Sequence, residues 1–381
     1  MKKILINRHN SGFYTALVDN GKLIEFIIDP TFGGSIVGNI YSGIIKKINT
    51  GFIFADIGLE KQAFIDSRDN REKGLFNGGK LTVKQGDALV VQILKDAVGE
   101  KGPVATSNIS ATGRFAVVSK SIEADAINFS RKLDSDERNR LGNIFKSIMM
   151  PGFSFIIRSD AAGRNAEEIS QEMTNLLSQF NERATARQKS VKPPAALHVT
   201  PPILKTVAEI AASDIDEILT DDAETHALLL EFFCPIFTDF KTKARLFSEN
   251  DHIFDHFFIK TQIAKLNDKK VWLKSGAFIM IEKTEACVTI DVNSGKSGGK
   301  SGGDTKLKVN LEAAKEIAYQ LRLRNLSGIV IIDFLHMKSK DDIESLTEFL
   351  RAELAKDRIS AICVGMTALG LMEVTRKRSR N

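Results

Sequence analysis

The chain has 381 residues, of which 43% are apolar and 27% are charged, so its composition is ordinary for a globular protein with an ample core. The formal net charge of +5 and the isoelectric point near 8.9 permit a nucleic-acid partner without requiring one. The three cysteines, Cys234, Cys287 and Cys363, lie far apart and form no CxxC pair. This excludes a disulfide framework and a zinc knuckle, and fits a reducing compartment.

No segment of the sequence predicts export or membrane insertion. The first residues, MKKILINRHN, have too short an apolar run for a signal peptide. The longest apolar run, residues 227–237, contains Glu231 and Pro235 and is too short to cross a bilayer. We therefore expect a soluble, cytoplasmic protein without a membrane span.

Short strand patterns open the chain. Residues 2–35 alternate as KKILIN, FYTALVDN and KLIEFIID, bounded by Asn, Gly and Pro. Residues 36–107 continue as NIYSGIIKKI, FIFADIG, QAFID and ALVVQILK, with turn signals between them. Short strands with glycine turns and aromatic residues predict an OB-fold barrel in this second segment, a fold whose face commonly stacks bases.

The middle of the chain mixes strands and helices. Residues 108–200 contain the strand patterns FAVVSK and FSFIIRS and the helical patterns SDERNRLGNIFKSIM and NAEEISQEMTNLLSQFNERATARQKS. The segment VKPPAALHVTPP, residues 191–202, has four prolines and is predicted to be a linker or boundary. Residues 203–269 are predicted to be largely helical, with a Phe-rich apolar face.

An α/β layer is predicted at the C-terminal end. The segment VWLKSGAFIMIEKTEACVTIDVNS, residues 271–294, has the pattern of a hairpin that leads into a strand. NLEAAKEIAYQLRLRN follows as a helix and GIVIIDFLHM as a buried strand, with a further helix at 341–357 and a last strand near ISAICVG. Alternating strands and helices are typical of an α/β layer.

The repeated GKS in VTIDVNSGKSGGKSGGDT invites a phosphate-loop interpretation, which the spacing excludes. A Walker loop needs a glycine five residues before the Gly-Lys pair. The required positions hold Ile290 and Ser294. The remaining interpretation is a basic, glycine-rich loop that can contact a polyanion.

Two aspartates follow apolar runs in this layer. Asp291 ends CVTID and Asp333 ends IVIID, with a crossover helix between them. If the two strands are neighbours, both carboxylates emerge at one edge of the sheet, where α/β folds place their sites. A hard cation such as Mg²⁺ would offset their repulsion. The alternative is that each aspartate caps a helix or lies in a turn, and the spacing does not decide between the two.

Several longer segments resemble one family. DVNSGK, TEACVTID and NLEAAKEIAYQLRLRNLSGIVIIDF closely resemble the catalytic segment of the ribonuclease E/G family of bacterial endoribonucleases. GNIYSGIIKKI and FIFADIG are similar to its OB-fold insert, FIIRSDAAGRNAEEI to its 5′-phosphate-sensing segment, and VWLKSGAFIMIEKTEA to the start of its catalytic subdomain.

The resemblance implies a fold of several subdomains, mixed α+β and α/β. It places an RNase H-like subdomain at residues 1–35 and 203–267 and an OB-fold RNA-binding domain at 36–107. A 5′-sensor region follows at 108–202, and a deoxyribonuclease I-like catalytic subdomain at 268–381.

The resemblance also implies roles for single residues. Asp291 and Asp333 match the aspartates that hold the catalytic Mg²⁺, for which Mn²⁺ is a possible substitute. Asn293 matches the amide that contacts the scissile phosphate, and strand alternation puts it on the same side of the chain as Asp291.

Two further groups of residues are implied in RNA binding. Phe54 and Phe64 match aromatic residues that grip a base, with Lys95 and Lys101 beside them. By itself the strand pattern favours core positions for both phenylalanines. In the sensor, Arg158 and Ser159 match the residues that hold a 5′-monophosphate, and Val117 matches a pocket residue. Serine stands where the family has threonine, and it keeps the hydroxyl donor. A surface ion pair is the alternative role for Arg158.

The implied function is Mg²⁺-dependent endonucleolytic cleavage of single-stranded RNA, leaving 5′-phosphate and 3′-hydroxyl ends. The implied substrates are messenger, ribosomal or transfer RNA precursors, in RNA processing and decay. The alternative is a non-hydrolytic single-stranded RNA-binding protein, which would not need Asp291, Asn293 and Asp333. Family members continue into a CPxC zinc link that joins protomers, whereas this sequence ends TRKRSRN. We therefore expect no zinc, a short ribonuclease G-like form and, if the chain associates, a homo-oligomer without that link.

Two histidine patterns suggest other chemistry. DHIFDHF places His252 and His256 four residues apart on a predicted helix, a spacing compatible with zinc, but no third ligand is evident. A charged helix face is therefore the preferred interpretation. His336, shortly after Asp333, is either a general base or a solvated residue at a strand end.

Overall fold

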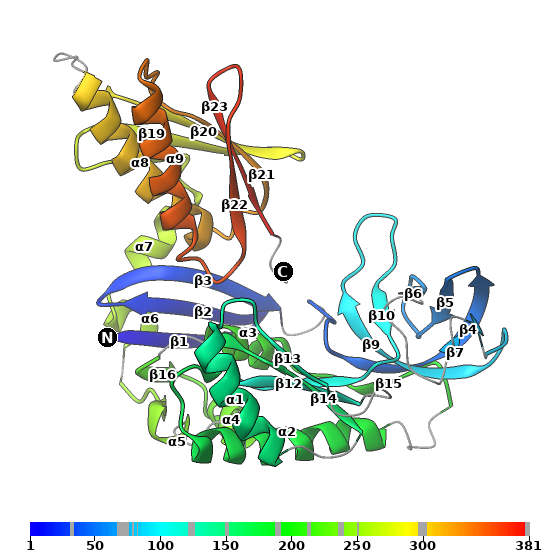
Figure 1. Ribbon diagram of the computed structural model, residues 1–381. Coiled ribbons are helices and arrows are strands. Elements are labelled where there is room, and N and C mark those ends of the chain that lie inside the picture. Colours follow the sequence, from blue (N-terminus) through cyan, green and yellow to red (C-terminus); the bar gives the residue numbers. More distant parts are fainter. Residues whose placement is uncertain are drawn as a thin grey trace. The chain divides into compact units, whose positions relative to one another are not determined.

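The computed structural model divides the chain into two units (Figure 1), residues 1–29, 215–221 and 247–381 on the one hand and residues 30–214 and 222–246 on the other. The structure describes residues 1–30, 34–66, 76–77, 80–81, 83–120, 126–148, 152–186, 192–211, 215–234, 240–249, 251–295 and 303–377. Among these residues, no helix is long and apolar enough to span a bilayer.

The first unit contains a sheet in which the strands run in the order β16-β1-β2-β3. The strands predicted in residues 2–35 are confirmed as β1 (Lys2–His9), β2 (Gly12–Asp19) and β3 (Lys22–Pro30). Leu5 and Leu23 pack there against Ile253 and Phe254 of the short helix α6 (Ile253–His256). Helix α7 (Lys260–Ala264) follows.

The prediction that residues 203–269 are largely helical is wrong in two places, since the described residues there include the strands β16 and β17 (Ala244–Leu246). Residues Glu217–Thr220 form the strand β16, which pairs in parallel with β1, Ile4 opposite Ile218. Such a short apolar segment does not differ in local pattern from a helical turn. The unpaired edge of β1, which is far away in the sequence, decides its structure.

A second sheet in the same unit has six strands in the order β18-β19-β20-β21-β23-β22. Their bounds are β18 (Lys270–Trp272), β19 (Phe278–Lys283), β20 (Cys287–Asn293), β21 (Gly328–Asp333), β22 (Ala361–Met366) and β23 (Leu371–Arg376). The predicted hairpin and the predicted strands are confirmed. β23 was not predicted, and it inserts antiparallel between β21 and β22.

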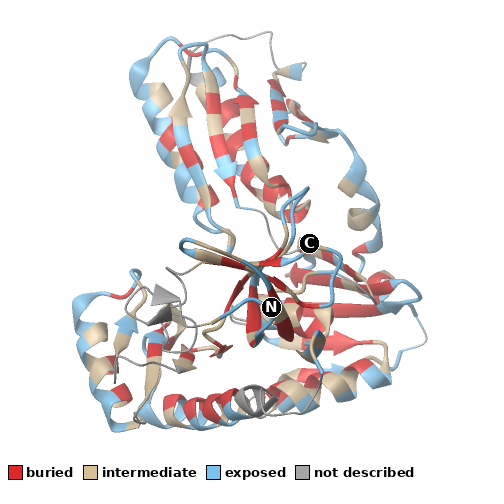
Figure 2. Ribbon diagram, turned by 90° about the vertical axis from the view of Figure 1, so that its right-hand side faces the viewer, coloured by how far each residue is buried: buried red, intermediate tan, exposed pale blue. Residues whose placement is uncertain are grey.

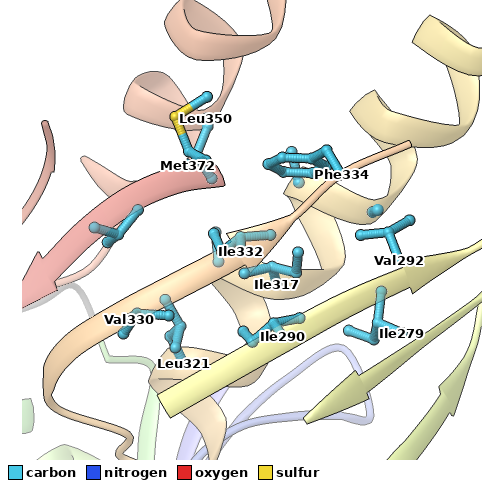
Figure 3. Close-up of a cluster of buried hydrophobic side chains, with 14 of the residues drawn as sticks. Ile279, Ile290, Val292, Ile317, Leu321, Val330, Ile332, Phe334, Leu350 and Met372 are labelled. Carbon is cyan, nitrogen blue, oxygen red and sulfur yellow. The ribbon is translucent and has the colours of Figure 1, made fainter. Parts of the chain in front are cut away.

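Both long helices of this unit pack on one face of that sheet. α8 (Gly303–Leu323) and α9 (Lys340–Leu354) match the predicted helices and lie side by side (Figure 1). Ile290 of β20 and Ile332 of β21 point toward Ile317 of α8, in a cluster of buried side chains (Figure 3). Alternation along the strands gives this face its apolar residues and leaves the other side chains to the opposite face. We call that opposite face, which includes Asp291, Asp333, Ile329 and Ile362, the open face.

The second unit contains a closed barrel. Strands follow the order β4-β5-β6-β10-β9, and β9 pairs back with β4. The bounds are β4 (Ile40–Asn49), β5 (Phe52–Asp56), β6 (Ala63–Asp66), β9 (Ala88–Lys95) and β10 (Val104–Thr106), with a small ribbon of β7 (Phe76–Asn77) and β8 (Lys80–Leu81). Five strands closed in this way fit the OB-like barrel predicted for residues 36–107.

The segment predicted to be a linker contains a strand. Residues Ala195–His198 form β15, which pairs antiparallel with β4 of the barrel. The prolines lie on either side of these four residues, so they leave the backbone of β15 available for pairing. The segment is therefore not an unstructured linker throughout.

The rest of the second unit is a four-stranded sheet covered by helices. The strand order is β11-β12-β14-β13, with bounds β11 (Ser110–Thr112), β12 (Ala116–Lys120), β13 (Ile127–Phe129) and β14 (Phe153–Ile157). α1 (Ser135–Ile148) and α2 (Ala166–Ala186), both predicted, pack on it through a cluster that includes Phe145, Phe155 and Met173. Further elements of this unit are η2 (Ser159–Ala161), α3 (Pro202–Ile210), α4 (Ala223–Phe233), α5 (Phe240–Lys243) and β17 (Ala244–Leu246). Buried residues alternate with more exposed ones along strands such as β5 and β20, whereas β1 is buried at four successive residues (Figure 2).

Candidate functional site

Asp291 and Asp333 lie directly opposite each other on neighbouring strands. β20 and β21 are parallel, and the two aspartates are partners in the register. Their strands are therefore spaced by about 4.8 Å. Both residues are exposed, while their neighbours Ile290, Val292 and Ile332 are buried against the helices. The predicted strand adjacency is confirmed, and both carboxylates project from the open face.

Asn293 joins this pair. Its amide nitrogen Nδ2 donates a 2.6 Å hydrogen bond to Oδ2 of Asp291, which confirms the predicted shared side. Two residues further on, Gly295 has a φ of +58°, and a Cβ there would lie 2.3 Å from the carbonyl oxygen of Gly276. Only glycine fits this close approach, which fixes the path of the chain as it leaves β20.

A buried amide on α8 holds the segment after Asp333. Asn310 is fully buried, and its Nδ2 donates to the carbonyl of Leu335 at 2.8 Å while its Oδ1 accepts from the Leu335 amide at 3.0 Å. The Lys306 ammonium donates to the carbonyl of His336 at 3.2 Å. The backbone beyond β21 is thus bound to the helix at two successive residues. Sequence reasoning missed Asn310, because its partners lie outside its own helix.

The donor set at this position suits a hard cation. Two carboxylates and one amide, all with oxygen donors, converge on a solvent-exposed surface. Mg²⁺ commonly binds through one or two carboxylates and keeps several waters, which this open surface would allow. Within the described ranges, no group of three or more His, Cys, Asp or Glu side chains could hold a metal ion. Two carboxylates beside an open surface fit a Mg²⁺ that keeps several of its waters.

Phe54 and Phe64 lie on the outer surface of the barrel. They are register partners on β5 and β6, and both are half-buried. Their neighbours Ile53 and Ile65 fill the barrel interior with no exposed surface. The core interpretation is therefore wrong for both phenylalanines, since alternation puts them on the face away from the interior.

A third aromatic residue, Phe52, completes a cluster with them. The three ring centroids are 5.5 to 5.8 Å apart, the tilted and edge-to-face spacing of interacting aromatics. The strand FIF places Phe52 on the same face as Phe54, so its period-two alternation was a usable signal. We call Phe52, Phe54 and Phe64 the barrel aromatic cluster.

Basic side chains flank this cluster. The register runs from exposed Lys47 through Phe54 and Phe64 to Val104 and exposed Lys95, so these residues form one cross-strand row. Lys101 is exposed on the segment between β9 and β10 and pairs through its backbone with Val98. The structure thus puts Lys95 in the row of the aromatic residues and adds Lys47, which the sequence analysis missed.

The residues predicted to sense a 5′-monophosphate lie around the ends of β12 and β14. Val117 pairs with Ile156, and the Arg158 amide donates to the carbonyl of Phe115. The Arg158 guanidinium donates through Nη1 to the carbonyl of Gly113 at 2.8 Å, and its Nη2 lies 3.7 Å from Oδ2 of Asp160. Nη1 of Arg158 is therefore already hydrogen-bonded within the protein. The surface ion pair considered as the alternative role of Arg158 is also present, as a long contact with Asp160.

A buried carboxylate supports this loop. Glu172 of α2 is 3% exposed, and its Oε1 accepts from the Phe115 amide at 2.7 Å. Gly113 makes room for it, since a Cβ there would lie 2.5 Å from that oxygen. Burial raises the pKa of Glu172 to about 7, although the hydrogen bond from Phe115 and the charges of Arg114 and Arg158 act in the opposite direction.

This raised pKa predicts a pH-dependent stability. Between the ordinary carboxyl pKa of 4.5 and the raised pKa of about 7, folded Glu172 keeps a proton that the unfolded chain releases. The contribution of Glu172 to the free energy of unfolding is therefore lost as pH rises through that window. Glu172→Gln cannot titrate, and from pH 5 to pH 8 it should gain up to roughly 3 kcal/mol in unfolding free energy relative to wild type. Urea unfolding at the two pH values measures this. Exposed Glu168→Gln on the same helix is the control, and a Glu172→Gln difference that does not vary with pH would contradict the prediction.

The other sequence candidates have structural roles, are exposed at the surface or lie outside the described residues. His252 caps α6 by accepting from the Phe254 amide, so it precedes the helix instead of lying on its face. The ring of His256 packs edge-on against Phe247. His336 is exposed beyond β21. The basic loop with the two GKS sequences falls largely in residues 296–302, outside the described residues.

Comparison with known proteins agrees with this arrangement. The model of the Ribonuclease E/G family matches residues 110–379. The chain is 33% identical to Ribonuclease G of Escherichia coli (strain K12) over 396 residues, covering 99% of this chain and 80% of that protein. It is 30% identical to Ribonuclease E of the same strain over 394 residues, covering 99% of this chain but 37% of that protein.

The chain belongs to the ribonuclease E/G family. The residues that the family model matches include Asp291, Asn293, Asp333 and Arg158. The barrel precedes them and is covered by the relatives that match the whole chain. Membership in this family implies an RNA substrate for the chain. The role of each single residue stays a prediction.

Proposed function

We propose that this chain, an endoribonuclease of the ribonuclease E/G family, cleaves single-stranded RNA in a Mg²⁺-dependent reaction. The proposed active site contains Asp291 and Asp333. The observation that carries the proposal is the register match of the two carboxylates, with the Asn293 amide bonded to one of them. A protein that only binds RNA would have no use for paired carboxylates exposed on a rigid sheet.

The residues of the chain perform three tasks in this proposal. Asp291 and Asp333 would hold Mg²⁺, and the bound ion supplies an activated water and charge neutralisation on the phosphodiester. The Asn293 amide has two N–H donors, and one is used on Asp291. The second can donate to an oxygen of the scissile phosphate and orient it. In-line attack by water on phosphorus would leave a 5′-phosphate and a 3′-hydroxyl.

The barrel would bind the substrate. Bases stack on the barrel aromatic cluster irrespective of sequence, because each base has a π face. Lys47 and Lys95 at the two ends of the row would pair with backbone phosphates, so binding should weaken with salt. Single-stranded stretches of messenger, ribosomal or transfer RNA precursors fit this surface better than a duplex, whose bases are already stacked.

A cleavage assay tests the proposal. Purified protein is incubated with a 5′-monophosphorylated single-stranded oligoribonucleotide in Mg²⁺, in Mn²⁺ and in EDTA, and the product ends are mapped by mass. We expect internal cleavage with 5′-phosphate and 3′-hydroxyl ends in either metal and none in EDTA. Binding without cleavage in both metals would instead support a non-hydrolytic RNA-binding protein.

We further propose that Arg158 and Ser159 sense the 5′-end. A planar guanidinium can hold a terminal phosphate with paired hydrogen bonds, which a 5′-hydroxyl cannot accept with comparable charge. Wild type should cleave monophosphorylated RNA faster than 5′-hydroxyl RNA. Arg158→Ala should remove most of this difference and leave cleavage of the hydroxylated RNA nearly unchanged, and Arg158→Lys should restore only part, because it lacks the fork. Initial rates on the two substrates measure this.

Asp160→Asn separates sensing from a structural ion pair. If the role of Arg158 is its ion pair with Asp160, Arg158→Ala and Asp160→Asn should both lower the free energy of unfolding. Each variant should then cleave the monophosphorylated and the 5′-hydroxyl RNA more slowly. If Arg158 binds the phosphate, removing the competing carboxylate should keep or increase the preference for monophosphorylated RNA. Equal losses on both substrates for Arg158→Ala would rule out the sensor.

A further inference from the structure

A second aromatic cluster lies on the open face of the sheet that carries Asp291. Trp272 of β18 and Phe278 of β19 are register partners with ring centroids 5.3 Å apart at 61°. The Lys270 ammonium lies 3.9 Å from the Trp272 ring centroid and 3.8 Å from that of Phe278. We call Lys270, Trp272 and Phe278 the sheet aromatic cluster. It does not belong to the barrel.

The register connects this cluster to the aspartate pair. Trp272 lies opposite Phe278, and Phe278 lies opposite Asn293, whose amide is bonded to Asp291. The next row runs from Lys270 through Met280 and Asp291 to Asp333. Because register partners share a face, the cluster and the carboxylates project from the same side. Trp272 is two strand spacings from Asn293, about 10 Å.

Packing does not explain the position of Trp272. Trp272 is 63% exposed, whereas its neighbours Val271 and Leu273 contact the buried core on the opposite face. What sets Trp272 apart is that its exposed ring adjoins a second aromatic ring, Phe278, and a lysine, the combination that single-strand binding sites use for stacking and phosphate contact. A cation–π contact with Lys270 uses only part of its ring surface.

The edge that carries the cluster is held firmly. In the turn between β18 and β19, the Lys274 amide donates to Oε1 of Glu312 on α8 at 2.7 Å, and the Ser275 amide lies 3.3 Å from the same carboxylate. Gly295 packs against Gly276 of this turn from the end of β20. The turn is therefore tied both to the helix behind the sheet and to the strand of Asp291, as a preformed binding surface requires.

We infer that the sheet aromatic cluster is a stacking subsite for the base of a nucleotide next to the scissile phosphate. A base would lie on the exposed indole, and Lys270 would pair with a phosphate of the same strand. A span of about 10 Å suits a base within about one or two nucleotides of the bond cleaved. This inference rests on the proposed function, since it takes Asp291 as the point of cleavage.

Trp272 is the only tryptophan in the sequence, so its fluorescence reports on the subsite directly. The protein is titrated in EDTA with the single-stranded oligoribonucleotide, and then with a set of oligonucleotides that each carry one abasic residue at a different position. We expect saturable quenching by the full oligonucleotide and a loss of quenching for an abasic residue at one position near the cleavage site. Unchanged fluorescence at saturating RNA would overturn the inference.

Kinetics of matched variants give a second readout. Trp272→Ala should raise KM by roughly 5- to 100-fold, with kcat changed by less than about twofold, and Trp272→Phe should retain most of the binding. The control is Ile362→Ala, because Ile362 is 58% exposed on the same face at the far edge strand. If Trp272→Ala behaves as Ile362→Ala does, the subsite does not exist. Quenching without any cleavage by wild type would refute the proposed nuclease and keep the subsite.

Discussion

Asp291→Asn and Asp333→Asn should each lower the cleavage rate by on the order of 10²–10⁴-fold at saturating RNA and Mg²⁺. Each change removes one charged ligand of the proposed ion, and metal-bound stabilisation of a transition state is worth several kcal/mol. Asparagine at position 291 can still accept the hydrogen bond from Asn293, so the local structure should persist. Both side chains are exposed, and removing one of two adjacent negative charges should not destabilise the sheet.

The matched control is Thr289→Val. Thr289 is exposed on β20 two residues before Asp291, on the same face, and carries no charge. It should cleave at nearly the wild-type rate. RNA affinity, measured by fluorescence anisotropy in EDTA, should be the same for all four proteins, since the barrel is untouched. If either aspartate variant cleaved RNA at the wild-type rate, the reaction would take place at another site.

Phe54→Ala and Phe64→Ala should each weaken single-stranded RNA binding by roughly 1–3 kcal/mol, the contribution of one base stacked on an aromatic ring. Both rings are half-buried on the outer surface of the barrel, and their centroids lie 5.8 Å apart. Their loss should therefore leave the barrel interior intact. Binding titrations with a short oligoribonucleotide, repeated at two salt concentrations, measure the effect.

A variant of a core residue in the same strand serves as the reference for destabilisation of the fold. Ile53 has no exposed surface, and Ile53→Ala should destabilise the barrel by roughly 2–5 kcal/mol through the cavity that it creates. Thermal melts beside the titrations separate the two effects. If Phe54→Ala lowered the melting temperature as much as Ile53→Ala does, the phenylalanine would be a packing residue and not a base platform.

The location of most elements followed from the sequence by itself. Strand patterns located β1 to β3 and the barrel strands β4, β5, β6 and β9, and apolar residues at helical spacing located α1, α2, α8 and α9. These signals are local, because burial of one face imposes its period on consecutive residues. The same alternation predicted correctly that Asn293 shares a side with Asp291. The sequence also indicated Asp291 and Asp333, because each is a charged residue at the end of an apolar strand pattern.

Tertiary structure decided which strands become neighbours and in what register. β16, β15 and β23 are short or unremarkable in sequence, and each exists because a distant strand offers it an edge. The pairing of Asp291 with Asp333, the capture of Leu335 by Asn310 and the row from Trp272 to Asn293 are all contacts between elements. A sequence fixes the period of each strand, but a shift of one residue in pairing would turn every side chain to the other face. Only the packed sheet therefore determines that two carboxylates, an amide and an indole share one surface.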